Sequence, residues 1–584
     1  MPYLFCILLS SFSARVFSAP DPKNLRVIYT NDWQSNLDYA PMALAKIQEL
    51  QTQSPYPTIT VDAGDTLMGS LYHTIAHKTG GGFTLMGKLN FDATTLGNHE
   101  LDFGIHKLSQ ILKATHHTHP QILASNLSLN TLLLQNDPQF KSFKKSLIIE
   151  KNGLKIGLIG LMGNHAQKHI KTSSEFHFQD PYSTAQQLVS KLKREGAKYI
   201  IALSHGGIHL QESGLWEGDD IELSKTQHLD LIIGGHSHTA LQLPLKQKNN
   251  WVVQAGSHLQ FVGHIDIHTP DNTVISAKLH PISLTPSGDF AHSLAHDIAE
   301  WRSLANKDLE KDLHLSWKEP LPTKQSISSQ ETQLLVAEAI REYAQSDFSM
   351  VGAGEIYPQS TTTPWTVDTV FKILPLGQGV RDDTPGAAIL KAWFYGYEII
   401  NLLESMLFLS KFTDSDFEPI FSGAHIAINT YRPPFFKIYD FNLTIDQTPL
   451  DPYKLYSVAT TSFGGSYLWQ IQDLSYGLLN ITPRTSQGKK SKNFKLHTLN
   501  SSHSSEAKAW ASIALWLKKH TIPQEQSFTI IKTPYAFDAF CFYTTALFIF
   551  ALTTCFLREV IKKLPFFLKL VVFLPISRLS LKTK

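Results

Sequence analysis

The stretch that decides the fold is residues 91–102, which read Phe-Asp-Ala-Thr-Thr-Leu-Gly-Asn-His-Glu-Leu-Asp. Its first half is a short β-rich run. Its second half places an amide, an imidazole and two carboxyl groups directly behind a glycine. Glycine lets the backbone turn sharply and approach a ligand closely. This pattern is typical of a strand that ends at a binding site, and it recurs elsewhere in the first half of the chain.

Four other β-rich runs also end in polar clusters. In an α/β sheet the carboxyl ends of the strands share one edge, where ligands bind. We therefore expect five strand ends to bring carboxylates, imidazoles and an amide into one cleft. The four runs are Leu25–Tyr29 before Asp32, Thr58–Val61 before Asp65, Tyr199–Leu203 before His205, and Leu229–Ile233 before His236 and His238.

The chain of 584 residues is too long for one domain. β-Rich runs alternate with helical stretches over residues 24–285, which predicts a layered α/β domain. Residues 286–322 are charged, look helical and end in a Pro-Leu-Pro sequence, so we interpret them as a linker. Residues 323–525 open with a helical pattern and then mix α and β, which predicts a second domain.

The composition is that of a globular protein, with 42% hydrophobic and 17% charged residues. A net charge of +2 gives no reason to expect nucleic acid as a partner. The three cysteines are Cys6, Cys541 and Cys555, so the chain between its two ends cannot form an internal disulfide. Many bacterial exported enzymes share this feature. The sequence does not indicate an oligomeric state.

Both ends of the chain are apolar. Residues 1–18 resemble a secretory signal peptide, although a buried strand is the alternative. Residues 539–557 carry no charge over 19 positions and would span about 28 Å as a helix. The basic tail 558–584 follows, and the positive-inside rule places it in the cytoplasm; the alternative is a buried core helix. We expect a bacterial membrane-anchored protein whose catalytic domains are periplasmic or extracellular.

A mixed Asp, Asn and His donor set favours Mn, Zn or Fe over Ca, which takes oxygen ligands. The absence of cysteine from the central part of the chain excludes a thiolate zinc site. One histidine or one Gly-Asp pair would mean little. An ordered set, with each member at a strand end, is much harder to obtain by chance.

These motifs resemble the 5′-nucleotidase / UDP-sugar hydrolase family of metallophosphoesterases over about residues 24–475. In the second half, Pro375-Leu376-Gly377 and Leu455–Thr460 carry the resemblance. It implies an N-terminal four-layer α/β/β/α metallophosphoesterase domain and a mixed α/β 5′-nucleotidase-type C-terminal domain that binds substrate.

The resemblance also implies a role for each site residue. Two divalent ions (Mn, Zn, Mg or Fe) are bridged by Asp65. His99 stabilises the transition state or assists the leaving group, and Asp102 orients it. The remaining implied ligands are Asp32 and His238 for the first ion, and Asn98, His205 and His236 for the second.

The first motif departs from the family, because Gln34 stands where the family has histidine. A glutamine oxygen can ligate a metal but is a weaker partner than imidazole for zinc. We therefore predict weaker affinity at the first position and a preference for Mn or Mg. The alternative is an impaired enzyme.

The second domain departs further. Gly354-Glu355-Ile356-Tyr357 replaces the family's Gly-Gly-Ile-Arg, and Gly464-Gly465-Ser466-Tyr467 loses an acid and a glycine. Phe421 and Phe463 are candidates for the two walls of an aromatic clamp on a nucleobase, with burial in the core as the alternative. Arg381 is a candidate phosphate contact, with a plain surface position as the alternative.

The sequence thus predicts two-metal hydrolysis of phosphate esters or anhydrides. Nucleotides are the preferred class, in 5′-nucleotidase, UDP-sugar hydrolase or cyclic-nucleotide phosphodiesterase type reactions. One alternative is a phosphohydrolase for a non-nucleotide ester, and another is a catalytically degenerate binding protein. The intact Asn98, His99 and Asp102 set argues against the degenerate protein.

Overall fold

The computed structural model describes residues 23–532, except 117, 171–173, 324–326, 358–363, 383, 411–417, 430–431, 434, 446, 467, 469–480, 502–505 and 521–530. The expected signal peptide 1–18, the apolar stretch 539–557 and the tail 558–584 lie outside the described residues. Within the described part of the chain, no helix combines the length and apolar character needed to cross a bilayer.

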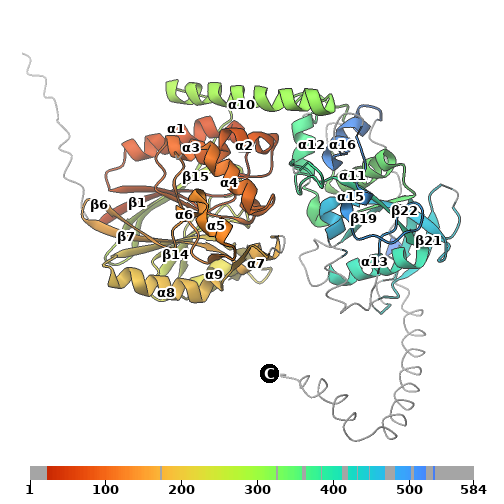
Figure 1. Cartoon of the computed structure of the whole chain (residues 1–584). Coiled ribbons are helices and arrows are strands. Elements are labelled where there is room, and N and C mark those ends of the chain that lie inside the picture. The colour runs from red at the N-terminus through yellow and green to blue at the C-terminus, as the bar shows by residue number, and fades with distance from the viewer. Residues whose placement is uncertain are drawn as a thin grey trace, which may run out of the picture. The chain divides into compact units, whose positions relative to one another are not determined.

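The first compact unit contains two six-stranded sheets (Figure 1). The first is antiparallel at one edge and parallel through to the other, whereas the second has a parallel centre and an antiparallel strand at each edge. The first sheet has the order β16 (Thr273–Pro281), β15 (Phe261–His268), β1 (Asn24–Thr30), β2 (Thr58–Asp62), β3 (Ala93–Thr95), β4 (Gln121–Leu123). The second has the order β13 (Leu245–Gln247), β14 (Asn250–Val253), β12 (Leu231–Gly234), β9 (Tyr199–His205), β7 (Leu154–Met162), β6 (Leu147–Lys151).

The main core lies between these sheets. Alternate side chains of a strand point to one face, so every second residue of each sheet can enter this layer. Val27 and Val61 from one sheet and Leu158 and Ile201 from the other lie in it and are fully buried. Helices α1 (Ala40–Thr52) and α4 (Ile105–Ala114) cover the outer face of the first sheet, and α8 (Pro181–Arg194) covers that of the second (Figure 1). The predicted four-layer α/β/β/α arrangement is confirmed.

Backbone hydrogen bonds continue beyond the strand ends. The amide of Asp32 donates to Gly64 at 2.9 Å, and that of Gly235 donates to Ser204 at 3.0 Å. The loops after β1 and β2, and after β9 and β12, therefore run side by side at one edge. This is the edge at which the sequence predicts the site.

The two units are not continuous in sequence. The first contains Met1–Leu321, Trp365–Ala387 and Ser501–Ala511. The predicted domain 323–525 is thus divided, because 365–387 and 501–511 group with the first unit. Within the predicted linker 286–322 lies helix α10 (Asp289–Leu313), which packs on α1.

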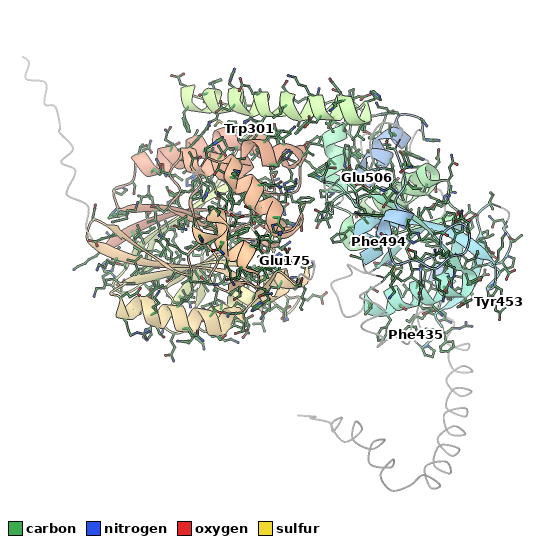
Figure 2. The ribbon with its side chains drawn as sticks, in the orientation of Figure 1. Glu175, Trp301, Phe435, Tyr453, Phe494 and Glu506 are labelled. Carbon is green, nitrogen blue, oxygen red and sulfur yellow. The ribbon has the colours of Figure 1, made fainter. Side chains whose placement is uncertain are left out.

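The second unit is a mixed α/β body, as predicted. Its four-stranded sheet is joined by β20 (Ala424–Ile428) paired with β21 (Ile438–Leu443) and by several helices. Phe435 and Tyr453 are among the aromatic side chains exposed on it (Figure 2). The sheet has the order β18 (Ile389–Tyr395), β22 (Leu455–Thr461), β17 (Phe348–Gly352), β19 (Pro419–Ser422), and the main helices are α11 (Ser329–Ala344) and α13 (Gly396–Leu409).

Candidate metal centre

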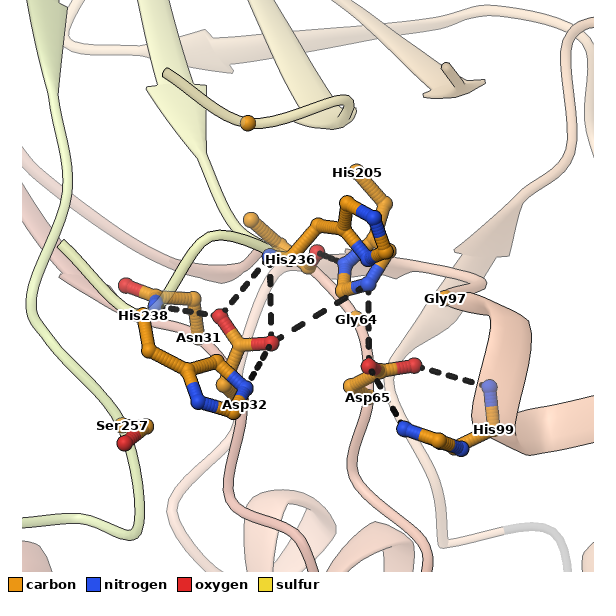
Figure 3. Close-up of polar contacts among 12 residues, drawn as sticks. Asn31, Asp32, Gly64, Asp65, Gly97, His99, His205, His236, His238 and Ser257 are labelled. Atoms are coloured by element: carbon orange, nitrogen blue, oxygen red, sulfur yellow. Dashed lines mark hydrogen bonds and ion pairs between the residues drawn. The ribbon is translucent and has the colours of Figure 1, made fainter. Parts of the chain in front are cut away.

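Asp65 lies at the centre of the predicted site, after β2, and is 1% exposed. Its Oδ2 lies 3.0 Å from His205 Nε2 and 3.8 Å from His99 Nε2 (Figure 3). Its Oδ1 accepts the backbone N–H of His99 at 2.9 Å. One carboxylate therefore faces groups from three strand ends, as a bridging ligand must.

Asp32 holds the neighbouring position after β1 and is fully buried. Its Oδ1 lies 3.6 Å from His238 Nε2 and 4.0 Å from His205 Nε2. The backbone N–H of His236 donates to both of its carboxylate oxygens, at 3.1 and 3.0 Å. Asn31 Nδ2 donates to Oδ2 at 2.6 Å, so the orientation of this carboxylate is fixed from several sides (Figure 3).

Five of the predicted ligands have left-handed backbone conformations, which non-glycine residues rarely adopt. Each such residue costs on the order of 1–3 kcal/mol and persists only where surrounding contacts enforce it, commonly at a functional site. The φ angles are 51° for Asp32, 46° for Gln34, 55° for Asp65, 73° for His236 and 55° for His238.

Two glycines are required by close approach within the site. A Cβ at Gly97 would lie 2.0 Å from Asp65 Oδ1. A Cβ at Gly235 would lie 2.8 Å from His205 Nδ1. Neither atom can move away without moving a predicted ligand, so the glycines before Asn98 and His236 are part of the site.

The described residues fit a metal ion at the second position. Asn98 Oδ1 is buried and has no hydrogen-bond partner, and the buried Nε2 of His205 faces Asp65 Oδ2 at 3.0 Å. His205 Nδ1 lies 2.8 Å from the carbonyl oxygen of Ala63, which can only accept, so Nδ1 carries the proton. When the His205 ring is neutral, its lone pair is therefore on Nε2, where it can bind a metal ion. The ligand atoms of Asp65, His205 and His236 lie within 4.8 Å of one another.

The charges of the centre also suit a cation. Burial alone would raise the pKa of Asp65, but the charges of His205 and His99 outweigh it and hold the pKa well below its usual range. Burial alone would lower the pKa of His205, but Asp65 raises it to about 10. In the metal-free chain a proton on His205 Nε2 therefore balances the charge of Asp65, as a divalent ion would do when bound.

His99 faces the centre and is held by Asp102. Its Nδ1 lies 2.7 Å from Asp102 Oδ2. Burial alone would lower the pKa of His99, but Asp65 and Asp102 outweigh it and raise the pKa to about 9. Nδ1 donates to the carboxylate, which turns Nε2 toward Asp65, as expected for a group that contacts substrate rather than metal.

The buried side chain of Glu100 is a site residue that the sequence analysis missed. It accepts the backbone N–H groups of Asp65, Thr66 and Leu67 at 3.0, 2.8 and 3.0 Å. It also accepts that of Gly97 at 2.6 Å. One carboxylate thus ties the loop after β2 to the loop after β3. Its position beside Asn98 and His99 in the opening motif was the available signal.

Contacts join six of the seven predicted ligands, including Gln34, which is 4% exposed and directed at His238. Asn98 lies between Gly97 and His99, both of which approach Asp65. The candidate substrate residues differ. Phe421 lies in the core of the second unit, 8% exposed, with ring centroids 5.3 Å from Phe348 and 5.7 Å from Phe441. The clamp wall predicted at Phe421 has no exposed ring face to offer, which agrees with the core alternative.

Phe463 and Arg381 lie in different units. Phe463 is half-buried directly after β22 in the second unit. Arg381 is exposed in the first unit. Its backbone N–H donates to the buried Glu506 at 2.9 Å. This contact involves only the backbone, and a phosphate contact by the Arg381 side chain stays a prediction.

Comparison with known proteins agrees with this geometry. The model of the calcineurin-like phosphoesterase family matches residues 25–240, and that of the 5′-nucleotidase C-terminal domain matches residues 318–470. The trifunctional nucleotide phosphoesterase protein YfkN of Bacillus subtilis is 29% identical over 310 residues, 46% of this chain and 20% of that protein. The Homo sapiens 5′-nucleotidase is 26% identical over 332 residues, 50% of this chain and 55% of that protein.

A similar solved structure is that of a 5′-nucleotidase precursor from Thermus thermophilus. It aligns with a TM-score of 0.63 at 19% identity, over 88% of this chain and 99% of that chain. At 19% identity, this structural similarity supports a shared fold. The matches to the curated relatives above span about half of those proteins' length or less.

Two packed sheets with Asp, Asn and His donors at their strand ends define a phosphoesterase of the calcineurin-like class. The resemblance of the motifs to 5′-nucleotidases is confirmed, because a calcineurin-like phosphoesterase model matches the first half of the chain and a 5′-nucleotidase C-terminal domain model matches the second.

Proposed function

We propose that this chain hydrolyses phosphate esters or anhydrides, with nucleotides as the preferred substrates, using two divalent ions. The observation that carries the proposal is the carboxylate of Asp65, which faces His205 Nε2 at 3.0 Å in a centre that also contains the buried, unpartnered Asn98 Oδ1. Asp32, Gln34 and His238 would hold the first ion, and Asn98, His205 and His236 the second. Such a pair supplies a hydroxide nucleophile at neutral pH and charge stabilisation for phosphoryl oxygens.

The chain's own contribution to chemistry is centred on His99. Asp102 fixes its ring through the 2.7 Å contact and keeps the proton on Nδ1. In the metal-free chain Asp65 and Asp102 raise the pKa of His99 to about 9, and the contact with Asp102 favours a ring that also carries a proton on Nε2. That N–H can donate to a phosphoryl oxygen or protonate the leaving group.

Nucleotide substrates are supported by the family of the second domain and by the names of the relatives. A non-nucleotide phosphate ester is the second candidate. It is favoured by the burial of Phe421, because a buried ring cannot stack on a base. It is also favoured by Tyr357, which stands where the family has the arginine of Gly-Gly-Ile-Arg.

We further propose that the reaction takes place outside the cytoplasm, on a chain anchored by residues 539–557. The support is the apolar N-terminal stretch together with the positive charges that follow 557. Protease added to cells whose outer layers have been removed, leaving the cytoplasmic membrane intact, should degrade the folded part of the chain and leave a short fragment. Full protection until that membrane is lysed would refute this location.

The function is tested with the purified full-length chain and added Mn²⁺, Zn²⁺ or Mg²⁺. Phosphate release is measured from a panel of nucleoside monophosphates, UDP-sugars, cyclic nucleotides and sugar phosphates. His99→Ala should lose at least about a hundredfold in kcat while metal content stays the same. His177→Ala, an exposed histidine on β8 (Phe176–Phe178), is the matched control. Equal turnover in His99→Ala, or one ion per chain at saturation, would overturn the two-metal proposal.

A further inference from the structure

A second group of imidazoles lies beside the predicted second metal position. Helix α7 (Asn164–Lys168) begins just after β7 and carries His165, and His169 follows its last residue. Residues four positions apart on a helix lie on the same face. The ring centroids of His165 and His169 are 5.1 Å apart. His236 joins them, with its Nε2 2.8 Å from His165 Nδ1 and its ring 5.6 Å from that of His169.

The backbone of this group is anchored to the site. The N–H of His165 donates to Asp219 Oδ2 at 2.7 Å. The N–H of Gly163 donates to the carbonyl of His205 at 2.9 Å. A Cβ at Gly163 would lie 2.4 Å from the Cα of Gly206, so only glycine permits this approach. The start of α7 is therefore held against the loop that follows β9.

We propose that His165, His169 and His236 form a further cation site, specific for borderline transition-metal ions such as Zn²⁺ or Ni²⁺. Their ligand nitrogens all lie within 4.8 Å of one another. Three imidazoles without an oxygen donor suit Zn²⁺, Ni²⁺ and Cu²⁺ and are poor ligands for Mg²⁺ or Mn²⁺. His169 is exposed, so an ion can reach the group from solvent.

The site competes with the predicted second position. His236 belongs both to this group and to the group with Asp65 and His205. A neutral imidazole offers one lone pair, so His236 serves one ion at a time. An ion on the three histidines therefore withdraws His236 from Asp65 and His205. This inference goes beyond the proposed function and makes excess Zn²⁺ or Ni²⁺ inhibitory where Mn²⁺ is not.

The test is a Ni²⁺ titration of the untagged full-length chain in saturating Mn²⁺, followed by calorimetry. His169→Ala is the main variant because its side chain is exposed and its loss leaves the fold intact. His165→Ala is the second variant, and His177→Ala is the control. Circular dichroism verifies the fold of each protein.

We expect wild type and His177→Ala to bind Ni²⁺ with the same affinity at this site. In His169→Ala and His165→Ala the Ni²⁺ affinity should fall at least tenfold, while the Mn²⁺ affinity changes less than twofold. The inhibitory Ni²⁺ concentration should rise by a similar factor. Unchanged Ni²⁺ binding in His169→Ala would overturn the site. Parallel loss of Mn²⁺ and Ni²⁺ affinity would overturn it too, because His165 and His169 would then only orient His236. Binding is read without turnover, so failure of the hydrolytic proposal is a separate result.

Discussion

Gln34 Nε2 lies 2.9 Å from His238 Nε2, so the glutamine amide meets the nitrogen that is predicted to bind the first ion. The amide nitrogen has no lone pair to offer a cation. To bind an ion together with His238, Gln34 must present its oxygen instead, which requires the amide to rotate. The contact between Gln34 and His238 must therefore break before an ion can bind at the first position.

Restoring an imidazole at this position should strengthen zinc binding. We expect Gln34→His to raise Zn²⁺ affinity at least tenfold, about 1.4 kcal/mol, because imidazole is a better zinc ligand than an amide oxygen. Competition against a chelator of known affinity measures the change. Gln34→Ala, which removes the donor, should bind more weakly than wild type. Equal affinity in all three proteins would show that residue 34 does not ligate the ion.

The strand ends were the predictable part of the site. Asp32, Asp65 and His205 each come at the end of a β-rich run, and parallel strands end at one edge of a sheet. The sequence could not show that Glu100 binds the amides of two loops, because those partners come from different strands. The burial of Phe421 was also undecided, because an apolar run contains core and surface aromatics alike until its neighbours are placed.

Domain limits were less predictable for a physical reason. Residues 365–387 follow the predicted linker in sequence, yet they pack with the first unit. In this segment Asp368 accepts the backbone N–H of Leu71 at 3.5 Å, and in the predicted linker Trp317 packs on Tyr72 with centroids 4.7 Å apart. Contacts of this kind join residues roughly 250–300 positions apart, and no local pattern reports them.

Metal binding should release protons. His205 carries a proton in the metal-free chain because Asp65 raises its pKa to about 10. A ligating histidine must be neutral, so an ion displaces this proton. Affinity for the second ion should therefore rise about tenfold per pH unit between pH 6 and 8. Calorimetry in two buffers with different ionisation enthalpies gives the number of protons released. An affinity that is independent of pH would contradict the His205–Asp65 pairing.

Asp102 should control the protonation of His99. In the metal-free chain Asp65 and Asp102 together raise the pKa of His99 to about 9. Asp102→Asn removes one of these charges, so the His99 pKa should fall while Asp65 still holds part of the increase. NMR titration of the histidine ring, assigned by its loss in His99→Ala, measures both values. If His99 has the same pKa in wild type and in Asp102→Asn, Asp102 does not control the protonation of His99.

The last prediction concerns Glu355, a fully buried carboxyl in the second unit. It accepts the backbone N–H of Gly352 at 2.9 Å and the hydroxyl of Thr461. Burial raises its pKa from 4.5 to about 7, and the hydrogen bonds only partly oppose this. The folded chain holds the Glu355 proton more tightly than the unfolded chain does. The contribution of Glu355 to the free energy of unfolding is therefore greatest below pH 4.5 and falls as the pH rises to about 7. The loss corresponds to about 3 kcal/mol.

Glu355→Gln should remove this loss, because a neutral amide can still accept from Gly352 and donate to Thr461 without ever ionising. Urea-induced unfolding of the second unit, measured between pH 5 and 8, should show a flatter dependence on pH for Glu355→Gln than for wild type. Glu418→Gln, in the same unit, is the control and should follow the wild-type curve. If wild type and Glu355→Gln lose stability in parallel over this range, another group carries the dependence, and Glu355 is ionised in the folded chain at pH 5.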